Sequence, residues 1–492
     1  MKLISANFYG AMLIATTLMS GCAVGPDYVR PAPPEVSRYT PEPLVQQTVS
    51  APAVAGEVQT FDENEKIPQQ WWTLFESPAL NKLIEQAIKN NPSVQQAEAS
   101  LKVAQEYVYA QQGAYYPSVS ANYSPSRQKE ALGTVTSSAA SGASLFNLHT
   151  AQLNVSYTAD VFGNNQRQVE SLQAQVDYQR FQREAAYLTL SSNVVNAAIQ
   201  EASLHAQIKA TNAMIDIEQE QLDLYRRQLE LGAIPEANVV AQVAQLAQTR
   251  SMLPPLLKQL AIQRDLLSAL VGRFPSEALP EVVEFSMLHL PQTMPLSLPS
   301  QLVEQRPDVR SAEAQLHAAS AEVGVAKSNM LPQFTLSASG GSMATQVSQL
   351  FKSGTGFWTL VGGITQPIFD GGTLLHKKRA AEAAYEQAAA QYRGTVIGAF
   401  QNVADTLQAL QLDADGVQTA STAERAADES LAIARRQVEL GDIDYLGLLS
   451  AEQSYQQSVI SLVQAQANRF ADTAALFQAL GGGWWNHDGV KQ

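Results

Sequence analysis

The spacing of hydrophobic and polar residues changes its period along the chain. Residues 80–113 place apolar side chains at helical spacing and come before Pro117, so they predict a helix that ends ahead of this proline. In 152–161 every second residue is polar, which is the period of a β-strand with one apolar face. The stretch 164–231 contains neither proline nor glycine, and a helix of that length would extend for roughly 100 Å. A compact domain needs no helix of this length.

The strand at 152–161 is one of four that the alternation predicts. It matches the length of a tilted transmembrane strand, although a half-buried sheet of a soluble domain has the same period. Membrane barrels start near eight strands, so a spanning protein of this kind must combine strands from several chains. The loop that connects the two strands of each pair is rich in Ser, Gly, Ala and Thr and would then face the exterior. The four strands are predicted at about 117–124, 152–161, 333–341 and 357–366.

The sequence after residue 70 consists almost entirely of an internal duplication. We assign one repeat to 71–290 and the other to 291–485, followed by a tail at 486–492. Each repeat reads helix, strand, loop, strand, very long helix, turn and helix. The turns that end the two long helices lie at Gly232 and Gly441. The matching segments are 91–94 with 306–309, 116–117 with 331–332, 161–163 with 368–370, and 226–234 with 435–443.

Each long helix is followed by a helical stretch of about half its length. In the first repeat this stretch is 236–271, and Pro254-Pro255 should bend or break it. The paired helices predict a rod in each repeat. The periodicity alone does not distinguish a solid coiled-coil bundle from the wall of a hollow tube.

The N-terminus has the features of an export signal and a lipid anchor. We assign 1–21 to a signal peptide, because its apolar run is shorter than a membrane-spanning helix requires. Leu18-Met19-Ser20-Gly21-Cys22 resembles a bacterial lipobox, which predicts acylation of Cys22; the alternative is a free thiol. Ala23 follows the cysteine, where an aspartate would signal retention at the inner membrane, so the outer membrane is the expected address. Residues 22–70 are interpreted as an extended, lipid-anchored tether.

Charge and composition exclude several classes of protein. The chain has 46 acidic against 32 basic residues and a net charge of −14, which argues against nucleic-acid partners. Its single cysteine permits no intrachain disulfide. Six scattered histidines and the calcium-loop-like Asp413-Ala414-Asp415-Gly416 lack the spacing of a metal site, and no phosphate loop, dinucleotide fingerprint or nucleophile elbow is present. We therefore predict no catalytic residue, no metal and no cofactor.

Several short motifs together resemble the outer-membrane factor family, in its NodT-type lipoprotein branch, which is related to the TolC exit ducts of tripartite efflux pumps. The resemblance implies a mainly α protein with a small membrane β-barrel: a homotrimer that closes a twelve-stranded barrel and forms an α-helical tunnel across the periplasm. It also implies two partners, a periplasmic adaptor (membrane fusion) protein and an inner-membrane transporter of the RND type. The motifs are CAVGPDY at 22–28, Trp71-Trp72, RPDVR at 306–310 followed by Ala312 and Glu313, and ALGGGW at 479–484.

The resemblance also places a gate at the periplasmic end of the second repeat. Leu446 aligns with a hydrophobic gate residue of the family, and Tyr445 lies beside it. Where family members often have an acidic ring, this chain has Gly447 and Ser450, with Glu452 further on. Asp442 and Asp444 are the nearest substitutes for that ring, or else two acids on an exposed turn.

The expected function is a passive exit duct for small molecules, such as drugs or other toxic compounds, with a periplasmic gate that the adaptor and transporter open. Two alternatives stay open, a lipid-anchored structural rod without a pore and an exit duct for secreted protein. An envelope enzyme finds no support in the residues. The sequence does not name the cargo.

Overall fold

The computed structural model describes residues 23–43, 45–63, 65–129, 145–277, 279–443 and 445–486. The described chain divides into two compact units. Unit 1 contains the N-terminal segment up to Pro31 together with Ser100–Gln179 and Ala312–Tyr392. Unit 2 contains Ala32–Ala99, Arg180–Ser311 and Arg393–Gln492.

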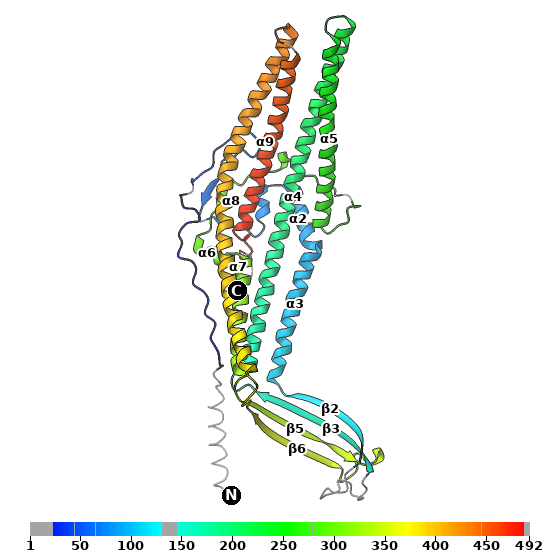
Figure 1. Cartoon of the computed structure of the whole chain (residues 1–492), viewed down its shortest axis with the longest axis vertical. Coiled ribbons are helices and arrows are strands. Elements are labelled where there is room, and N and C mark those ends of the chain that lie inside the picture. Colours follow the sequence, from blue (N-terminus) through cyan, green and yellow to red (C-terminus); the bar gives the residue numbers. More distant parts are fainter. Residues whose placement is uncertain are drawn as a thin grey trace. The chain divides into compact units, whose positions relative to one another are not determined.

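Unit 1 is built on an antiparallel four-stranded sheet in the order β2-β3-β5-β6 (Figure 1). The strands overlap the four ranges that the alternation predicts, but β2 and β3 are longer than expected. Polar side chains such as Arg127 interrupt the apolar period near the loop, while the backbone ladder continues through them. The strands are β2 (Ser118–Lys129), β3 (Leu145–Ala159), β5 (Gln333–Ala344) and β6 (Gly356–Thr365).

The register of the sheet separates apolar from polar side chains. Successive side chains of a strand point to opposite faces, so each paired row belongs to one face. One row across all four strands is Val119, Val155, Ala338 and Leu360. The next row is Ser120, Asn154, Ser339 and Thr359. The sheet therefore has one apolar face and one polar face.

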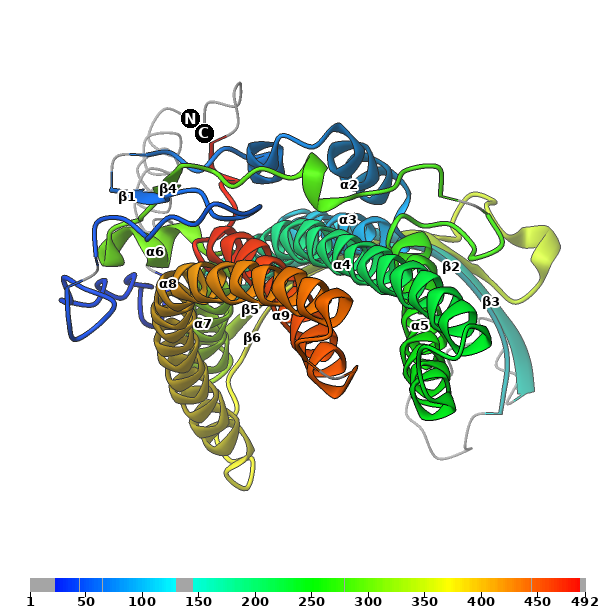
Figure 2. The same ribbon diagram turned by 90° about the horizontal axis from the view of Figure 1, so that it is seen from above.

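The helices follow the same order in both repeats. In unit 2, α5 returns along α4 and α9 returns along α8 (Figure 1, Figure 2), and each pair forms a helical hairpin. The first repeat contains α2 (Pro78–Asn90), α3 (Pro92–Gln112), α4 (Asn164–Glu230) and α5 (Glu236–Leu270). The second contains α6 (Pro299–Gln305), α7 (Pro307–Ser328), α8 (Thr373–Leu440) and α9 (Tyr445–Ala479). Short elements are β1 (Thr60–Asp62), β4 (Thr293–Pro295), and the single turns η1 (Trp71–Phe75), η2 (Gly113–Tyr115), η3 (Phe285–Met287) and η4 (Val347–Gln349).

Proline affects two of the predicted helices in different ways. The helix expected at 80–113 is two helices, since Pro92 lacks an N–H and the side chain of Asn91 accepts a hydrogen bond from the Ser93 amide to begin α3. Conversely, Pro254-Pro255 does not break α5. Only two backbone donors are lost there, and contacts with α4 hold the helix on both sides, as in the bond of 3.0 Å from Gln263 to the Ala197 carbonyl.

Both long helices end in the same way. Gly232 and Gly441 have φ of +70° and +80°, the left-handed conformation that closes a helix C-terminus. The next residue in each case, Ala233 or Asp442, donates its amide five residues back at 2.8 Å. The two turns are thus duplicated in structure as well as in sequence.

The core of unit 2 is aromatic. Trp71, Phe75, Phe470 and Phe477 are all 0% exposed, and the rings of Trp71 and Phe477 stack at 5.4 Å. In the part of the chain that the structure describes, no helix is long and apolar enough to cross a membrane.

Candidate functional site

The end of the α8–α9 hairpin holds the residues that the sequence assigns to a gate. Asp442 is exposed in the turn after Gly441, and Ser450 is exposed on α9. Asp444 lies outside the described residues, and for Tyr445 and Leu446 the structure describes the backbone at the start of α9 but not the side chains. Asp442 and Ser450 are therefore on the surface, whereas the gate role of Leu446 stays a prediction.

A groove of about 590 Å³ runs between α8 and α9 beside this turn. Small side chains make it, because glycine, alanine and serine leave space where larger residues would fill the gap between two helices. Gly447 and Ser450, where the family places an acidic ring, both line the groove. Sequence reasoning missed the groove, although the spacing of small residues on α9 could have indicated it. The small lining residues are Ala426, Ser430, Ala434, Gly447, Ser450, Ala451 and Ser454.

Glu452 does not extend the exposed acidic surface of the turn. It is 0% exposed, and neither carboxylate oxygen has a hydrogen-bond partner. Burial and the charge of Glu218 raise its pKa to about 7, although Arg435 opposes them. A buried acid of this kind is not visible in the sequence, because its burial depends on how four helices pack.

A second cluster anchors the start of the chain. Cys22 lies outside the described residues, and the described chain begins at Ala23. The Val24 amide donates to the Phe162 carbonyl at 3.1 Å. Gly25 has φ of +119° and lies so close to α7 that a Cβ there would be 2.5 Å from Cα of Gly324. The first residues of the predicted tether are therefore docked on unit 1.

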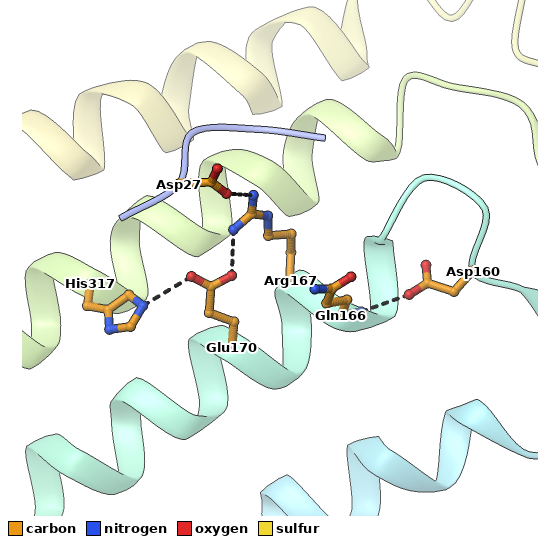
Figure 3. Close-up of polar contacts among 6 residues, drawn as sticks. All are labelled: Asp27, Asp160, Gln166, Arg167, Glu170 and His317. Carbon is orange, nitrogen blue, oxygen red and sulfur yellow. Dashed lines mark hydrogen bonds and ion pairs between the residues drawn. The ribbon is translucent and has the colours of Figure 1, made fainter. Parts of the chain in front are cut away.

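Charged side chains hold this docked segment (Figure 3). Arg167 of α4, whose side chain is 5% exposed, donates to Asp27 and to Glu170, each at 2.6 Å. Nε2 of His317 on α7 lies 3.1 Å from the other oxygen of Glu170, and the Tyr28 ring stacks on His317 at 4.2 Å. Burial disfavours the charged form of Arg167, but its two acidic partners outweigh that effect and raise its pKa. We call these five residues the N-terminal clamp.

Two further parts of the predicted tether, Thr48 and residues 57–59, are also held by buried contacts. Arg469 of α9 is 0% exposed and donates to the Thr48 hydroxyl at 3.0 Å and to the Glu57 carbonyl at 2.6 Å. Gln59, also 0% exposed, donates to the Pro291 carbonyl. These buried polar contacts fix a segment that has almost no secondary structure.

The described residues contain no group of three or more His, Cys, Asp or Glu side chains placed to hold an ion. The calcium-loop-like Asp413 lies within α8. Burial and a hydrogen bond with Asp472 raise its pKa to about 7.

Known proteins share this architecture over nearly the whole chain. The family model described as outer membrane efflux protein matches residues 83–273 and 298–482, one match in each repeat. The chain is 29% identical to the pyoverdine export outer membrane protein OpmQ of Pseudomonas putida, covering 88% of this chain and 92% of that one. It is 26% identical to the probable efflux pump outer membrane protein TtgC of the same species, covering 97% and 96%.

Solved structures give the same result for the fold. The open state of the MtrE outer membrane channel of Neisseria gonorrhoeae superposes with a TM-score of 0.78 at 25% identity, covering 94% of this chain and 99% of that one. The chain belongs to the outer membrane efflux protein family and is the outer-membrane exit component of an efflux system.

Proposed function

We propose that three copies of this chain form a passive, gated exit duct for small toxic molecules. A periplasmic adaptor protein and an inner-membrane transporter of the RND type would load the duct and open it. The chain itself would catalyse no reaction. The observation that carries the proposal is the four-stranded sheet with one apolar face and two open edges.

The sheet has the dimensions and polarity for crossing a bilayer. Its strands have 10 to 15 residues, and about 9 to 11 tilted residues cross the hydrocarbon core. The apolar row through Val155 would face lipid, and the polar row through Asn154 would face an aqueous lumen.

The edges of the sheet explain the oligomer. Among the described residues, the outer edges of β2 and β6 pair with no other strand. An unpaired backbone group costs several kcal/mol in lipid, so each edge needs a strand from another copy. Three sheets joined β6 to β2 make a closed sheet of twelve strands, which is the number the family resemblance implies.

The gate is assigned to the end of the α8–α9 hairpin. Leu446 would close the duct, with Tyr445, Asp442, Asp444 and Ser450 around it. The groove between α8 and α9 offers a polar, small-residue surface that suits a helical element of the adaptor. A partner that binds the open arrangement more tightly than the closed one would shift the gate toward opening.

Acylation of Cys22 would anchor each copy in the outer membrane. The docked N-terminal segment supports this assignment, because the Val24 amide donates a hydrogen bond to the carbonyl of Phe162, three residues beyond the end of β3. A lipid on the preceding cysteine would therefore start close to the membrane-spanning sheet.

A strain lacking the gene tests the proposal when it is compared with the same strain complemented. We expect excess accumulation of at least one compound in a panel of a cationic dye, an anionic aromatic acid and a metal salt, reversed by complementation. Purified protein should also conduct ions in planar bilayers as a trimer. Protein without conductance would favour the poreless rod, and normal conductance without any accumulation difference would favour another cargo, such as secreted protein.

A further inference from the structure

Two buried carboxylates lie near each other where the helical hairpins α4–α5 and α8–α9 meet, because Gln245 of α5 contacts both Glu218 and Gln453, the neighbour of Glu452. Glu218 lies on α4 and Glu452 on α9, and each is 0% exposed. The hairpins also touch through two polar contacts from α9 to α5: Gln453 donates to Gln245 at 3.4 Å, and Gln456 donates to the sulfur of Met252 at 3.1 Å.

The two carboxylates have unequal surroundings. Oε1 of Glu218 accepts hydrogen bonds from the Gln245 amide at 3.1 Å and the Thr249 hydroxyl at 2.8 Å, both on α5. Glu452 accepts none, and its nearest cation is Arg435, with Nη2 at 4.0 Å from Oε1. Burial raises the pKa of both carboxyls, but the hydrogen bonds from Gln245 and Thr249 oppose this rise at Glu218, so Glu218 is the better place for the negative charge and Glu452 for a proton.

Among the charged and titratable groups that face the pair in the described chain, Arg435 is the single cation. Tyr225 of α4 is buried, and burial and the charge of Glu452 both raise its pKa. The α5 residues that donate to the Glu218 carboxylate, Gln245 and Thr249, are neutral. The charged and titratable groups that face this region are Glu218 and Tyr225 on α4, Glu424, Asp428 and Arg435 on α8, and Glu452 and Tyr455 on α9.

We propose that Glu452 is a proton-operated junction between the two hairpins. With a proton on Glu452 the hairpins stay joined, and without it repulsion from Glu218 favours their separation. The inference rests on the proposed function, in which the ends of these hairpins close the duct. It deepens that function by adding proton concentration as a regulator of the gate.

The direction of the pH effect follows from the two states. In the joined state the pKa of Glu452 is raised from 4.5 to about 7, whereas separated hairpins would admit water and return it toward its usual value. The joined state therefore holds a proton that the separated state releases. Raising the pH from about 5.5 to 7.5 should increase the ratio of separated to joined hairpins on the order of tenfold.

Planar-bilayer recordings of the full-length trimer between these two pH values test the junction. The wild-type open probability should rise by about tenfold. The open probability of Glu452→Gln, whose side chain is always neutral, should stay low at both pH values. Glu439→Gln is the matched control, because Glu439 is 63% exposed on α8, and it should behave as wild type. An unchanged pH response in Glu452→Gln would overturn the inference.

A second measurement separates this inference from the proposed function. Spin labels at Leu224→Cys on α4 and Ile433→Cys on α8, both exposed sites, report the separation of the hairpins without requiring conduction. The distance distribution should gain a longer component at the higher pH in wild type but not with Glu452→Gln. A trimer that conducts with pH-independent distances contradicts the junction alone. A trimer that never conducts but shows the pH-dependent distances contradicts the proposed duct alone.

Discussion

The substitution Gly25→Ala tests whether the N-terminal clamp is a docked structure or a passive tether. Gly25 has φ of +119°, which an alanine rarely adopts, and its added Cβ would lie 2.5 Å from the backbone Cα of Gly324. A strained backbone of this kind costs about 1 to 3 kcal/mol. Overpacking against a backbone atom that cannot rotate away costs about 1 to 3 kcal/mol more. With partial relaxation, docking of residues 23–30 should weaken by about 2 to 4 kcal/mol.

Amide hydrogen exchange at Val24 measures this loss directly. The Val24 amide donates to the Phe162 carbonyl, so it exchanges with solvent only when the N-terminal segment detaches from unit 1. At 1.4 kcal/mol for each factor of ten, exchange should accelerate by about 30- to 700-fold, up to the rate of an unprotected amide.

Gly113→Ala is the control for this experiment. No atom lies within 4 Å of the position its Cβ would take, and Gly113 does not have a positive φ. In Gly113→Ala the exchange rate of the Val24 amide should match that of the wild type. Unchanged protection in Gly25→Ala would refute the close-approach argument and the docking of residues 23–30.

Three further substitutions test the proposed gate, the lipid anchor and a buried acid. Leu446→Ala should increase resting conductance in planar bilayers several-fold, and an unchanged trace would remove Leu446 from the gate. Cys22→Ser should abolish incorporation of labelled palmitate, and persistent labelling would contradict the lipobox assignment. Asp413 has a raised pKa of about 7, so its ionisation destabilises the folded state progressively as pH rises from its usual 3.8 toward 7. Asp413→Asn should therefore raise the free energy of unfolding by about 1 kcal/mol at pH 8 but not at pH 4. An equal gain at both pH values would show that the ionisation of Asp413 is not its cause.

The features set by local periodicity were predictable from the sequence. Strand β3 and the long helices α4 and α8 were found because a period of two and an unbroken period near 3.6 differ over many residues. The duplication located Gly232 and Gly441, because both turns need a left-handed glycine. The family motifs then supplied the function.

The features set by contacts distant in sequence were not predictable. Nothing in the spacing of Arg167 indicates that it is buried between Asp27 and Glu170. Likewise the sequence does not distinguish Glu452 from other acidic residues of a helix, and only the packing of four helices removes it from water. The effect of proline also depended on distant contacts: Pro92 separates α2 from α3, whereas Pro254-Pro255 leaves α5 unbroken where contacts with α4 maintain the helix.

The open edges of the sheet have a genetic consequence. In the proposed trimer each copy completes its β2 and β6 edges with other copies, so a cell that makes both a normal and a defective subunit would mix them in the same ring. With equal amounts and random mixing, only about one trimer in eight contains three normal subunits. A variant that folds and assembles but blocks the duct will therefore be dominant over the normal gene, whereas a variant that cannot form its sheet will be recessive.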